Sequence, residues 1–345
     1  MRGPETKGTT MRRKNLLGTT LLGTTLLRTT LLRTTLIGLF ALSGTVLTTG
    51  TASAAGPISL TSGFYVNPGS NPAVWVSGNP ADPRAASIRS SIASRPIARW
   101  FTGNESGGVG PAVSGYVGAA ASHDLLPVLV AYDIPLRDAC GGQSSGGAAS
   151  VSDYHTWIST FAAAVGSRPA VVVIEPDALA DFSCLTAAQT ADRLAMLQYA
   201  TRMFQQKAPN TWAYLDAGHA GWIDVATMAS RLNSAGVHSI RGFALNVSSF
   251  RTTAESESYG NSIDSALGGT SPFVVDTSRN GNGSNGEWCN PSGRRLGVPP
   301  QVGAGADMLL WIKTPGNSDG ECGIAPTVPA GQFSPDLATR LIAGT

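Results

Sequence analysis

The chain has 345 residues, with 24 basic side chains, 22 acidic side chains and 4 cysteines. Residues 1–55 hold 7 of the basic and 1 of the acidic residues, so residues 56–345 keep 17 and 21 and are acidic. This balance argues against a nucleic-acid partner, which would require a basic surface. The length of this acidic segment suits a single α/β barrel.

Residues 1–55 resemble a secretory leader. They begin with basic residues, continue through repeated leucines and end in the small residues "TASAA" (51–55). The apolar run 36–46 is too short to cross a bilayer, so we expect no membrane span in the mature chain. The sequence predicts a leader over 1–55, a catalytic domain over 56–345 and a secreted, extracellular protein. The export route, Sec or Tat, and the start codon stay open.

All four cysteines lie in the predicted mature segment. They are Cys140, Cys184, Cys289 and Cys322. An even number in an exported protein predicts two disulfides, and these spacings leave three pairings open. Because no CxxC or HxxxH spacing occurs, we expect no metal site.

Eight apolar runs, separated by helix-like intervals, predict the fold. The runs are 63–66, 96–101, 126–135, 170–177, 212–218, 242–249, 272–278 and 307–313. The interval 186–207 has helical periodicity, with Leu194, Leu197 and Ala200 on one face. Alternating strands and helices indicate a parallel α/β barrel, and no linker to a second domain is evident.

Polar residues, many of them carboxylates, stand at the ends of these runs, where the active sites of such barrels lie. They are Asp133, Asp138, Glu175, Asp177, Asp216, Asn246, Asp276, Arg279, Lys313 and Asp319. Aspartate is also a common helix cap and turn residue, which accounts for any single member. Capping accounts poorly for a whole set at equivalent strand ends. We therefore interpret the set as a cleft for acid–base chemistry.

Other catalytic patterns fail in their context. The run "GNGSNG" (281–286) is not followed by a helix, which argues against a dinucleotide site. The four histidines form no zinc signature, and no G-x-S-x-G elbow occurs. Trp75, Trp222 and Trp288 lie in polar, loop-like contexts, where an aromatic ring can stack on a sugar. The tryptophans expected in the core are Trp100, Trp157, Trp212 and Trp311.

Six motifs occur in order along the chain. They are "AYDIPLRDACGGQSSGG" (131–147), "VIEPDALA" (173–180), "LDAGHAGW" (215–222), "LNVSSF" (245–250), "DTSRNGNGSNGEWCNPSGRRLG" (276–297) and "LLWIKTPGNSDGEC" (309–322). Together they resemble glycoside hydrolase family 6 over residues 57–345. The resemblance implies a distorted, partly open parallel β/α barrel of the TIM-like class. It also implies hydrolysis of β-1,4-glucan with inversion, a polysaccharide partner and no cofactor, and we expect a monomer.

The resemblance assigns roles to the matching positions. Asp177 matches the proton donor, and Asp138 matches the aspartate that raises the donor's pKa. Asp319 matches the proposed base, which acts through water, and Asp216 matches a supporting carboxylate. Glu175 is expected to make structural hydrogen bonds. The implied substrate-binding positions are Tyr132, Ser145, His219, Trp222, Asn246, Trp288 and Lys313. Trp75 is added to them because of its polar sequence context. Arg137 and Arg279 match arginines that hold the carboxylates by charged hydrogen bonds.

The resemblance also implies which cysteines pair. It gives the disulfides Cys140–Cys184 and Cys289–Cys322, which would tie down the loops of the cleft. Each would stabilise the chain by about 3–4 kcal/mol in the chain-entropy account.

Two positions depart from the family pattern and put local details in doubt. Ala139 lengthens "RDAC", which affects the register of Ser145, and Asn317 replaces a glutamate common near Asp319. The loops after Asp177 and Asp319 look too short to roof the cleft, which predicts an endo-β-1,4-glucanase. The alternatives are an exo-acting cellobiohydrolase of the same family and a non-catalytic glycan-binding protein. Side activity on mixed-linkage glucan and the pH optimum stay open.

Overall fold

The computed structural model describes residues 56–345, which lie within one compact unit. The predicted leader lies outside the described residues. Among these residues no helix is long and apolar enough to cross a membrane.

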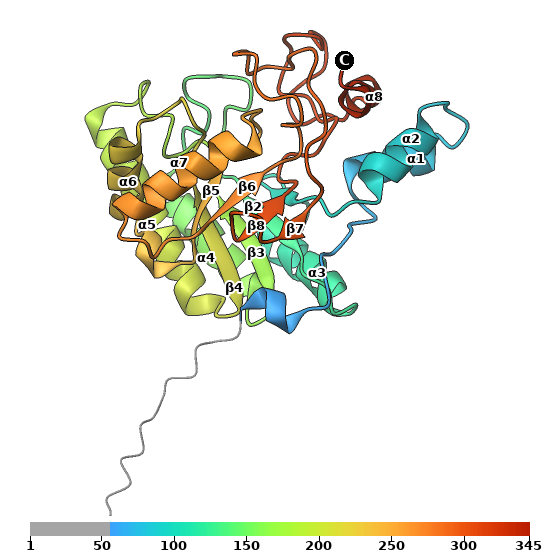
Figure 1. The fold of residues 1–345 in the computed structure, drawn as a ribbon. Coiled ribbons are helices and arrows are strands. Elements are labelled where there is room, and N and C mark those ends of the chain that lie inside the picture. The colour runs from blue at the N-terminus through green and yellow to red at the C-terminus, as the bar shows by residue number, and fades with distance from the viewer. Residues whose placement is uncertain (1–55) are drawn as a thin grey trace, which may run out of the picture. The chain divides into compact units, whose positions relative to one another are not determined.

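A curled sheet of eight strands forms the centre of the fold (Figure 1). The strands are β1 (Arg99–Phe101), β2 (Val128–Ala131), β3 (Ala170–Ile174), β4 (Thr211–Asp216), β5 (Gly242–Leu245), β6 (Phe273–Asp276), β7 (Gln301–Val302) and β8 (Met308–Leu310). Their order is β1-β2-β3-β4-β5-β6-β8-β7, and all pairs are parallel except the antiparallel pair β7–β8. The sheet is therefore a partly open barrel, as the resemblance implied, and not a closed one. One hydrogen bond links the residue before β1 to the residue after β8: the N–H of Ala98 donates to the carbonyl of Trp311 at 2.9 Å.

Helices cover the outer face of the sheet and its C-terminal edge (Figure 1). They are α1 (Asn71–Gly78), α2 (Ala85–Ile88), α3 (Val109–Ala121), α4 (Val151–Val165), α5 (Ala187–Lys207), α6 (Val225–Ser234), α7 (Thr253–Ala266) and α8 (Pro335–Ala343), with the short turns η1 (Pro57–Leu60), η2 (Arg89–Ala93) and η3 (Val237–Ser239). The helix predicted over 186–207 is confirmed as α5. Thr186 begins it with a capping box in which Thr186 and Gln189 satisfy each other's backbone N–H groups.

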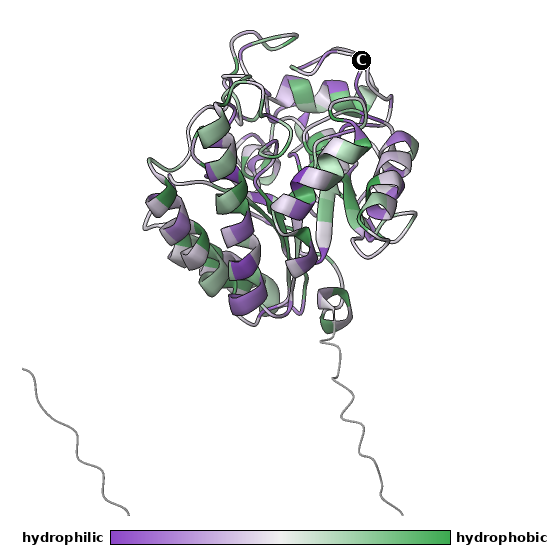
Figure 2. Ribbon diagram, turned by 90° about the vertical axis from the view of Figure 1, so that its left-hand side faces the viewer, coloured by the Kyte–Doolittle hydropathy of each residue, from purple (hydrophilic) through white to green (hydrophobic). Residues whose placement is uncertain are grey.

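The aliphatic strands are buried on both faces, which explains their continuous apolar sequences. In β3, Val172 and Ile174 pack in the large cluster beneath the helices, whereas Val171 and Val173 pack in a second cluster inside the curled sheet. Figure 2 shows the hydrophobic residues along the strands and hydrophilic residues on the outer turns of the helices. This packing leaves the polar residues that follow each strand on one edge of the sheet.

Two expectations from the sequence were wrong in detail, and one strand was not predicted. The run 63–66 forms no strand, and only Phe64 makes an isolated bridge, with Leu126. The short antiparallel strand β7 was not predicted. Trp75 lies in helix α1 and not in a loop, because Pro72 starts a helix there and the indole packs 6.0 Å from the Phe333 ring.

Candidate active site

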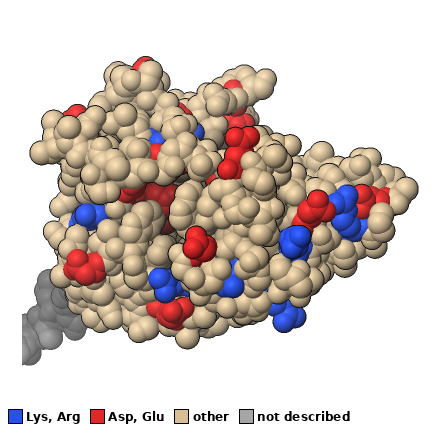
Figure 3. Space-filling model, turned by 90° about the horizontal axis from the view of Figure 1, so that it is seen from above, with Lys and Arg blue, Asp and Glu red and all other residues tan. Residues whose placement is uncertain are grey.

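The polar strand ends gather around a hollow at the C-terminal edge of the sheet. Viewed from above, acidic side chains line this hollow between the loops (Figure 3), and we call it the cleft. The backbone is strained at this edge. Non-glycine residues with positive φ concentrate there, among them Leu136, Asp138, Glu175, Asp177, Asn246, Ser248 and Asn290. Such conformations persist only where surrounding contacts hold them, and they are common at functional sites.

Asp177 and Asp216 form a carboxyl pair in the cleft. Asp177 follows β3 with φ of 68° and is half-buried, while Asp216 ends β4 and is 1% exposed. Asp216 Oδ1 accepts the N–H of Asp177 at 3.0 Å and of Gly218 at 2.9 Å. Its Oδ2 has no hydrogen-bond partner among the described residues.

The environment of this pair favours protonated carboxyls. Burial raises the pKa of Asp177 well above its ordinary value, and Asp216 and then Asp138 raise it further. Burial raises the pKa of Asp216 to about 7, although the two backbone N–H groups oppose this shift. The sequence-based interpretation named Asp138 as the group that raises the donor's pKa. In the structure Asp138 does raise this pKa, but burial has the largest effect and Asp216 the second.

The loop that carries Asp138 is folded back on itself. Asp138 Oδ2 accepts the N–H of Ser144 at 2.5 Å, and residues 137 and 146 form an isolated antiparallel bridge. Arg137 donates to the carbonyls of Tyr132 at 2.6 Å and Ser144 at 2.9 Å. Its closest carboxylate is Asp133, at 3.9 Å, so it holds the loop backbone and not Asp138. Ser145 is exposed on this loop.

Asp319 has the opposite environment, because two cations hold it. Arg279 donates to both of its oxygens, at 3.0 and 2.8 Å, and Lys313 Nζ lies 3.0 Å from Oδ1. The backbone N–H of Asn290 also donates to Oδ2 at 3.1 Å. Burial alone would raise the pKa of Asp319, but Arg279 and Lys313 outweigh burial and lower it. The pKa of Asp319 is therefore shifted in the opposite direction to the pKa values of Asp177 and Asp216.

Glu175 makes structural hydrogen bonds, as predicted. Its carboxyl accepts the N–H groups of Asp133, at 3.0 and 3.1 Å, and Ile134, at 3.0 Å. The side chain is 1% exposed, and burial raises the pKa of Glu175 to about 8. It thus fastens the end of β2 to the end of β3.

The predicted sugar-binding residues divide into exposed and buried groups. Trp222 and Trp288 are 41% and 56% exposed, and the His219 ring lies 5.3 Å from the Trp222 ring. Tyr132 is 8% exposed and packs edge-on against Trp100. The indoles of Trp222 and Trp288 are therefore flat apolar surfaces on which a sugar ring could stack.

Asn246 is fully buried, and its amide is occupied by the protein. Its Nδ2 donates to the carbonyls of Arg251 and Asp276, and its Oδ1 accepts the N–H of Arg251 at 3.0 Å. The structure therefore places Asn246 beneath the loops and not on the surface of the cleft. The sequence predicted a sugar contact here, but the side chain has no exposed surface, and its φ of 64° places the residue in a turn.

Both disulfides connect the pairs that the resemblance implied. Cys140–Cys184 joins the Asp138 loop to the segment after β3, with 5.4 Å between the Cα atoms. Cys289–Cys322 joins the Asn290 segment to the Asp319 loop, with 6.0 Å between the Cα atoms. Among residues 56–345 no group of three His, Cys, Asp or Glu side chains could hold a metal ion.

Sequence reasoning missed two residues that organise the cleft. Asn290 pairs with Asp319 through both backbone and side chain, since its Oδ1 accepts the N–H of Asp319 at 2.9 Å. Gln143 reaches from the Asp138 loop to the Asp319 loop, where its Oε1 accepts the N–H of Glu321 at 3.2 Å. The position of Asn290 next to Cys289 was a usable signal. No sequence signal identified Gln143, because the contact joins residues 178 apart.

A partly open β/α barrel with carboxyls of opposite pKa shift at its C-terminal edge is an arrangement that suits hydrolysis by acid–base catalysis. The chain belongs to glycosyl hydrolases family 6, whose family model matches residues 61–345.

The relatives that match this chain are similar over most of its length. It is 56% identical to Endoglucanase 1 of Streptomyces halstedii over 85% of this chain and 92% of that protein. It is 43% identical to Endoglucanase A of Thermobispora bispora over 86% of this chain and 65% of that protein. Among solved structures, the endoglucanase Cel6 of Mycobacterium tuberculosis, in complex with a methyl-cellobiosyl-thio-cellobioside, is 41% identical. It covers 84% of this chain and 99% of its own, with a TM-score of 0.77.

Proposed function

We propose that the protein is a secreted endo-β-1,4-glucanase that hydrolyses internal bonds of cellulose and soluble β-1,4-glucans with inversion of configuration. The carboxyl pair Asp177–Asp216 is the observation that carries this proposal, because it keeps a proton available in the cleft near neutral pH. The endoglucanase relatives and the exposed indoles of Trp222 and Trp288 support a glucan substrate.

Asp177 serves as the general acid in this proposal. Its raised pKa lets it hold a proton at the pH where it must protonate the leaving glycosidic oxygen. Asp216 positions Asp177 through the backbone N–H bond, and Asp138 and Asp216 disfavour the ionised form of the acid. After bond cleavage the same electrostatics favour its reprotonation.

Asp319 serves as the acceptor for the proton of the attacking water. Inversion requires the water to attack the face opposite the acid, with a second carboxylate to take its proton. Asp319 is ionised, but Arg279 and Lys313 make it a weak base. We therefore propose that it receives the proton through intervening water, with Ser145 and the backbone of its exposed loop as positioning groups.

An endo mode requires a cleft that admits a chain from the side. The loops that carry Asp138 and Asp319 meet through the bond from Glu321 N–H to Gln143 Oε1. Both residues are exposed, so water competes for this bond and its net strength is about 1 kcal/mol. Such a contact can open to admit an internal segment of glucan, which supports endo action over a permanent tunnel.

The exo-acting cellobiohydrolase is the competing function, because the same loop contact would roof the cleft if it stayed closed. Carboxymethylcellulose separates the two modes, since internal cuts lower viscosity early, whereas attack from chain ends releases cellobiose with little loss of viscosity. Rapid viscosity loss per reducing end supports the proposal. Cellobiose as the dominant product from the outset contradicts it.

A further inference from the structure

Asp276 is a buried carboxylate that the proposed chemistry does not use. It ends β6, is 1% exposed and accepts four backbone N–H groups. Oδ1 accepts from Ser278 at 2.9 Å and from Ile312 at 3.2 Å, while Oδ2 accepts from Lys313 at 2.9 Å and Ser248 at 3.1 Å. A carboxylate in this arrangement has both oxygens fully occupied.

These four donors belong to the ends of three strands. Ser248 follows β5, Ser278 follows β6, and Ile312 and Lys313 follow β8. Besides the N–H of Thr277, which donates to the carbonyl of Leu310 at 2.8 Å, Asp276 connects these strand ends across this part of the C-terminal edge.

Two of the connected segments lead directly to the cations that hold Asp319. Lys313 itself donates its backbone N–H to Asp276 and places Nζ 3.0 Å from Asp319. Arg279 follows Ser278 in the chain, donates to Asp319 and also donates to the carbonyl of Ser248. The backbone positions of both cations therefore depend on the same buried carboxylate.

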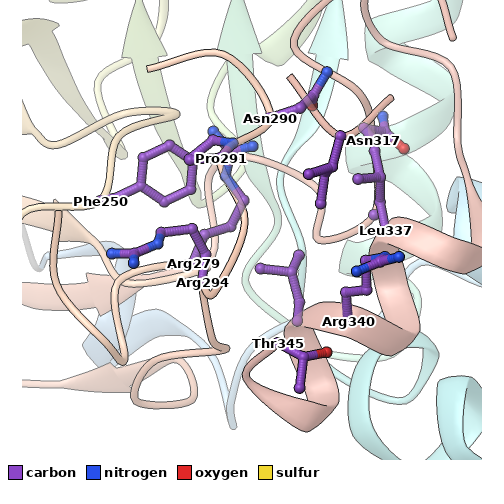
Figure 4. A pocket seen from close by; sticks show the side chains of 12 residues that line it. Phe250, Arg279, Asn290, Pro291, Arg294, Asn317, Leu337, Arg340 and Thr345 are labelled. Atoms are coloured by element: carbon purple, nitrogen blue, oxygen red, sulfur yellow. The ribbon is translucent and has the colours of Figure 1, made fainter. Parts of the chain in front are cut away.

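Arg279 is 3% exposed and also packs against an aromatic ring and a small cavity. Its guanidinium lies 4.4 Å from the Phe250 ring centre, and its Nε has no hydrogen-bond partner among the described residues. A cavity of about 20 Å³, room for roughly one water molecule, lies beside it and is lined by Phe250, Asn290 and Arg294 among others (Figure 4). The hydrogen bonds of Arg279 to Asp319 and to the Ser248 carbonyl, together with the backbone that carries it, therefore fix the position of the guanidinium.

We propose that Asp276 is a positioning residue that sets the geometry of the Arg279–Asp319–Lys313 cluster by tying together the ends of β5, β6 and β8. The proposal rests on the proposed function, in which this cluster handles the proton of the attacking water. Asp276 itself does not touch the substrate.

Asp276→Asn changes the anchor while keeping its shape. The amide nitrogen turns a hydrogen-bond donor toward one pair of backbone N–H groups, either Ser278 and Ile312 or Ser248 and Lys313, and so repels that pair. A misplacement of about 1 Å at a reacting group can cost roughly 100-fold in rate, so we expect kcat to fall by about 10- to 100-fold.

A double-mutant cycle on carboxymethylcellulose tests the proposal, with kcat measured for wild type, D276N, D319A and the double variant. If Asp276 acts through Asp319, D276N lowers kcat in the wild-type background and changes it by less than about twofold in the D319A background. If D276N lowered kcat by the same factor in both backgrounds, the proposal would be overturned. An unchanged kcat in folded D276N would also overturn it.

Asp307→Asn is the matched control. Asp307 also holds a network, accepting from Arg241 at 2.7 and 2.9 Å and from the Tyr214 hydroxyl at 2.8 Å, but it precedes β8 at the opposite edge of the sheet. D307N is expected to lower thermal stability with the same small effect on kcat in both backgrounds. A coupling to D319A as large as that of D276N would assign the effect to general loosening and overturn the proposal.

Two further measurements keep the test decisive. If D276N does not fold at the assay temperature, D276S takes its place, because its smaller side chain leaves room for water to satisfy the N–H groups. A crystal structure of the variant shows the geometry of the Arg279–Asp319–Lys313 cluster independently of any activity measurement. Displacement of Lys313 or Arg279 from Asp319 supports the proposal, and an unchanged cluster contradicts it. A wild-type enzyme inactive on glucans would instead refute the proposed function.

Discussion

Asp319→Asn and Asp177→Asn should change stability in opposite directions, although both remove a carboxylate from the same cleft. Asp319 is held by Arg279 and Lys313, and the exposed fractions of the Arg279 and Asp319 side chains are only 4% and 6%. Removing one partner of a buried ion pair leaves the other charge uncompensated and costs about 3–5 kcal/mol. For a domain of this size the melting temperature should fall by about 6–20 °C.

Asp177 has no cation within salt-bridge distance among the described residues, and its neighbours include Asp216 and Asp138. Burial and these carboxyls disfavour its ionised form, so folding at pH 7 requires the carboxyl to take up a proton, and a neutral amide of the same shape avoids this cost. We expect the melting temperature of D177N to be unchanged or to rise by about 2–4 °C, equivalent to roughly 1 kcal/mol.

Thermal unfolding of both variants and wild type at pH 7, followed by circular dichroism with the disulfides intact, measures this difference. Lysine and arginine variants elsewhere on the surface serve as a baseline, since exposed pairs contribute about 0–1 kcal/mol. A melting temperature of D319N equal to or above that of D177N would refute the electrostatic account of the cleft.

Three further predictions concern pH, the loop contact and a disulfide. The pKa of Asp216 rises from its ordinary 3.8 to about 7 on folding, so the folded chain keeps a proton that the unfolded chain releases. The contribution of Asp216 to the free energy of unfolding is complete below pH 3.8 and is lost as the pH rises toward 7. The fall in melting temperature over this interval should be smaller in D216N, and an equal fall would contradict the assignment. Gln143→Ala should increase viscosity loss per reducing end, because the bond to Glu321 no longer closes the loops, and a larger share of released cellobiose would argue the reverse. Replacing Cys289 and Cys322 by serine should lower the unfolding free energy by about 3–4 kcal/mol in chemical denaturation, and a loss below about 1 kcal/mol would show that the Asp319 loop needs no cross-link.

Much of the sheet was predictable because most of its strands can be recognised from a short continuous run of apolar residues. Continuous aliphatic runs such as the one in β3 are buried on both faces, and this burial explains both their composition and their parallel pairing. The antiparallel β7 escaped prediction because it has only two residues, both exposed, and is defined by its pairing with β8. The run 63–66 has the composition of a strand, but only Phe64 meets a partner.

The candidate site was predictable in its carboxylates and less so in its contacts. Strand ends in a barrel converge, so the order of motifs was enough to bring Asp177, Asp216 and Asp319 to one edge. The partners of each group depend on loop conformation, which short-range patterns do not specify. Asn246 was therefore expected at the sugar, and the bond from Gln143 to the Asp319 loop was not foreseen.

The most direct test of the account compares wild type with Asp177→Asn on carboxymethylcellulose, following viscosity and reducing ends together. The account predicts early viscosity loss by the wild type and the loss of nearly all activity in D177N, with the variant still folded. Full activity in D177N would contradict the assignment of Asp177 as the acid. Reducing ends released by the wild type without loss of viscosity would contradict the endo mode.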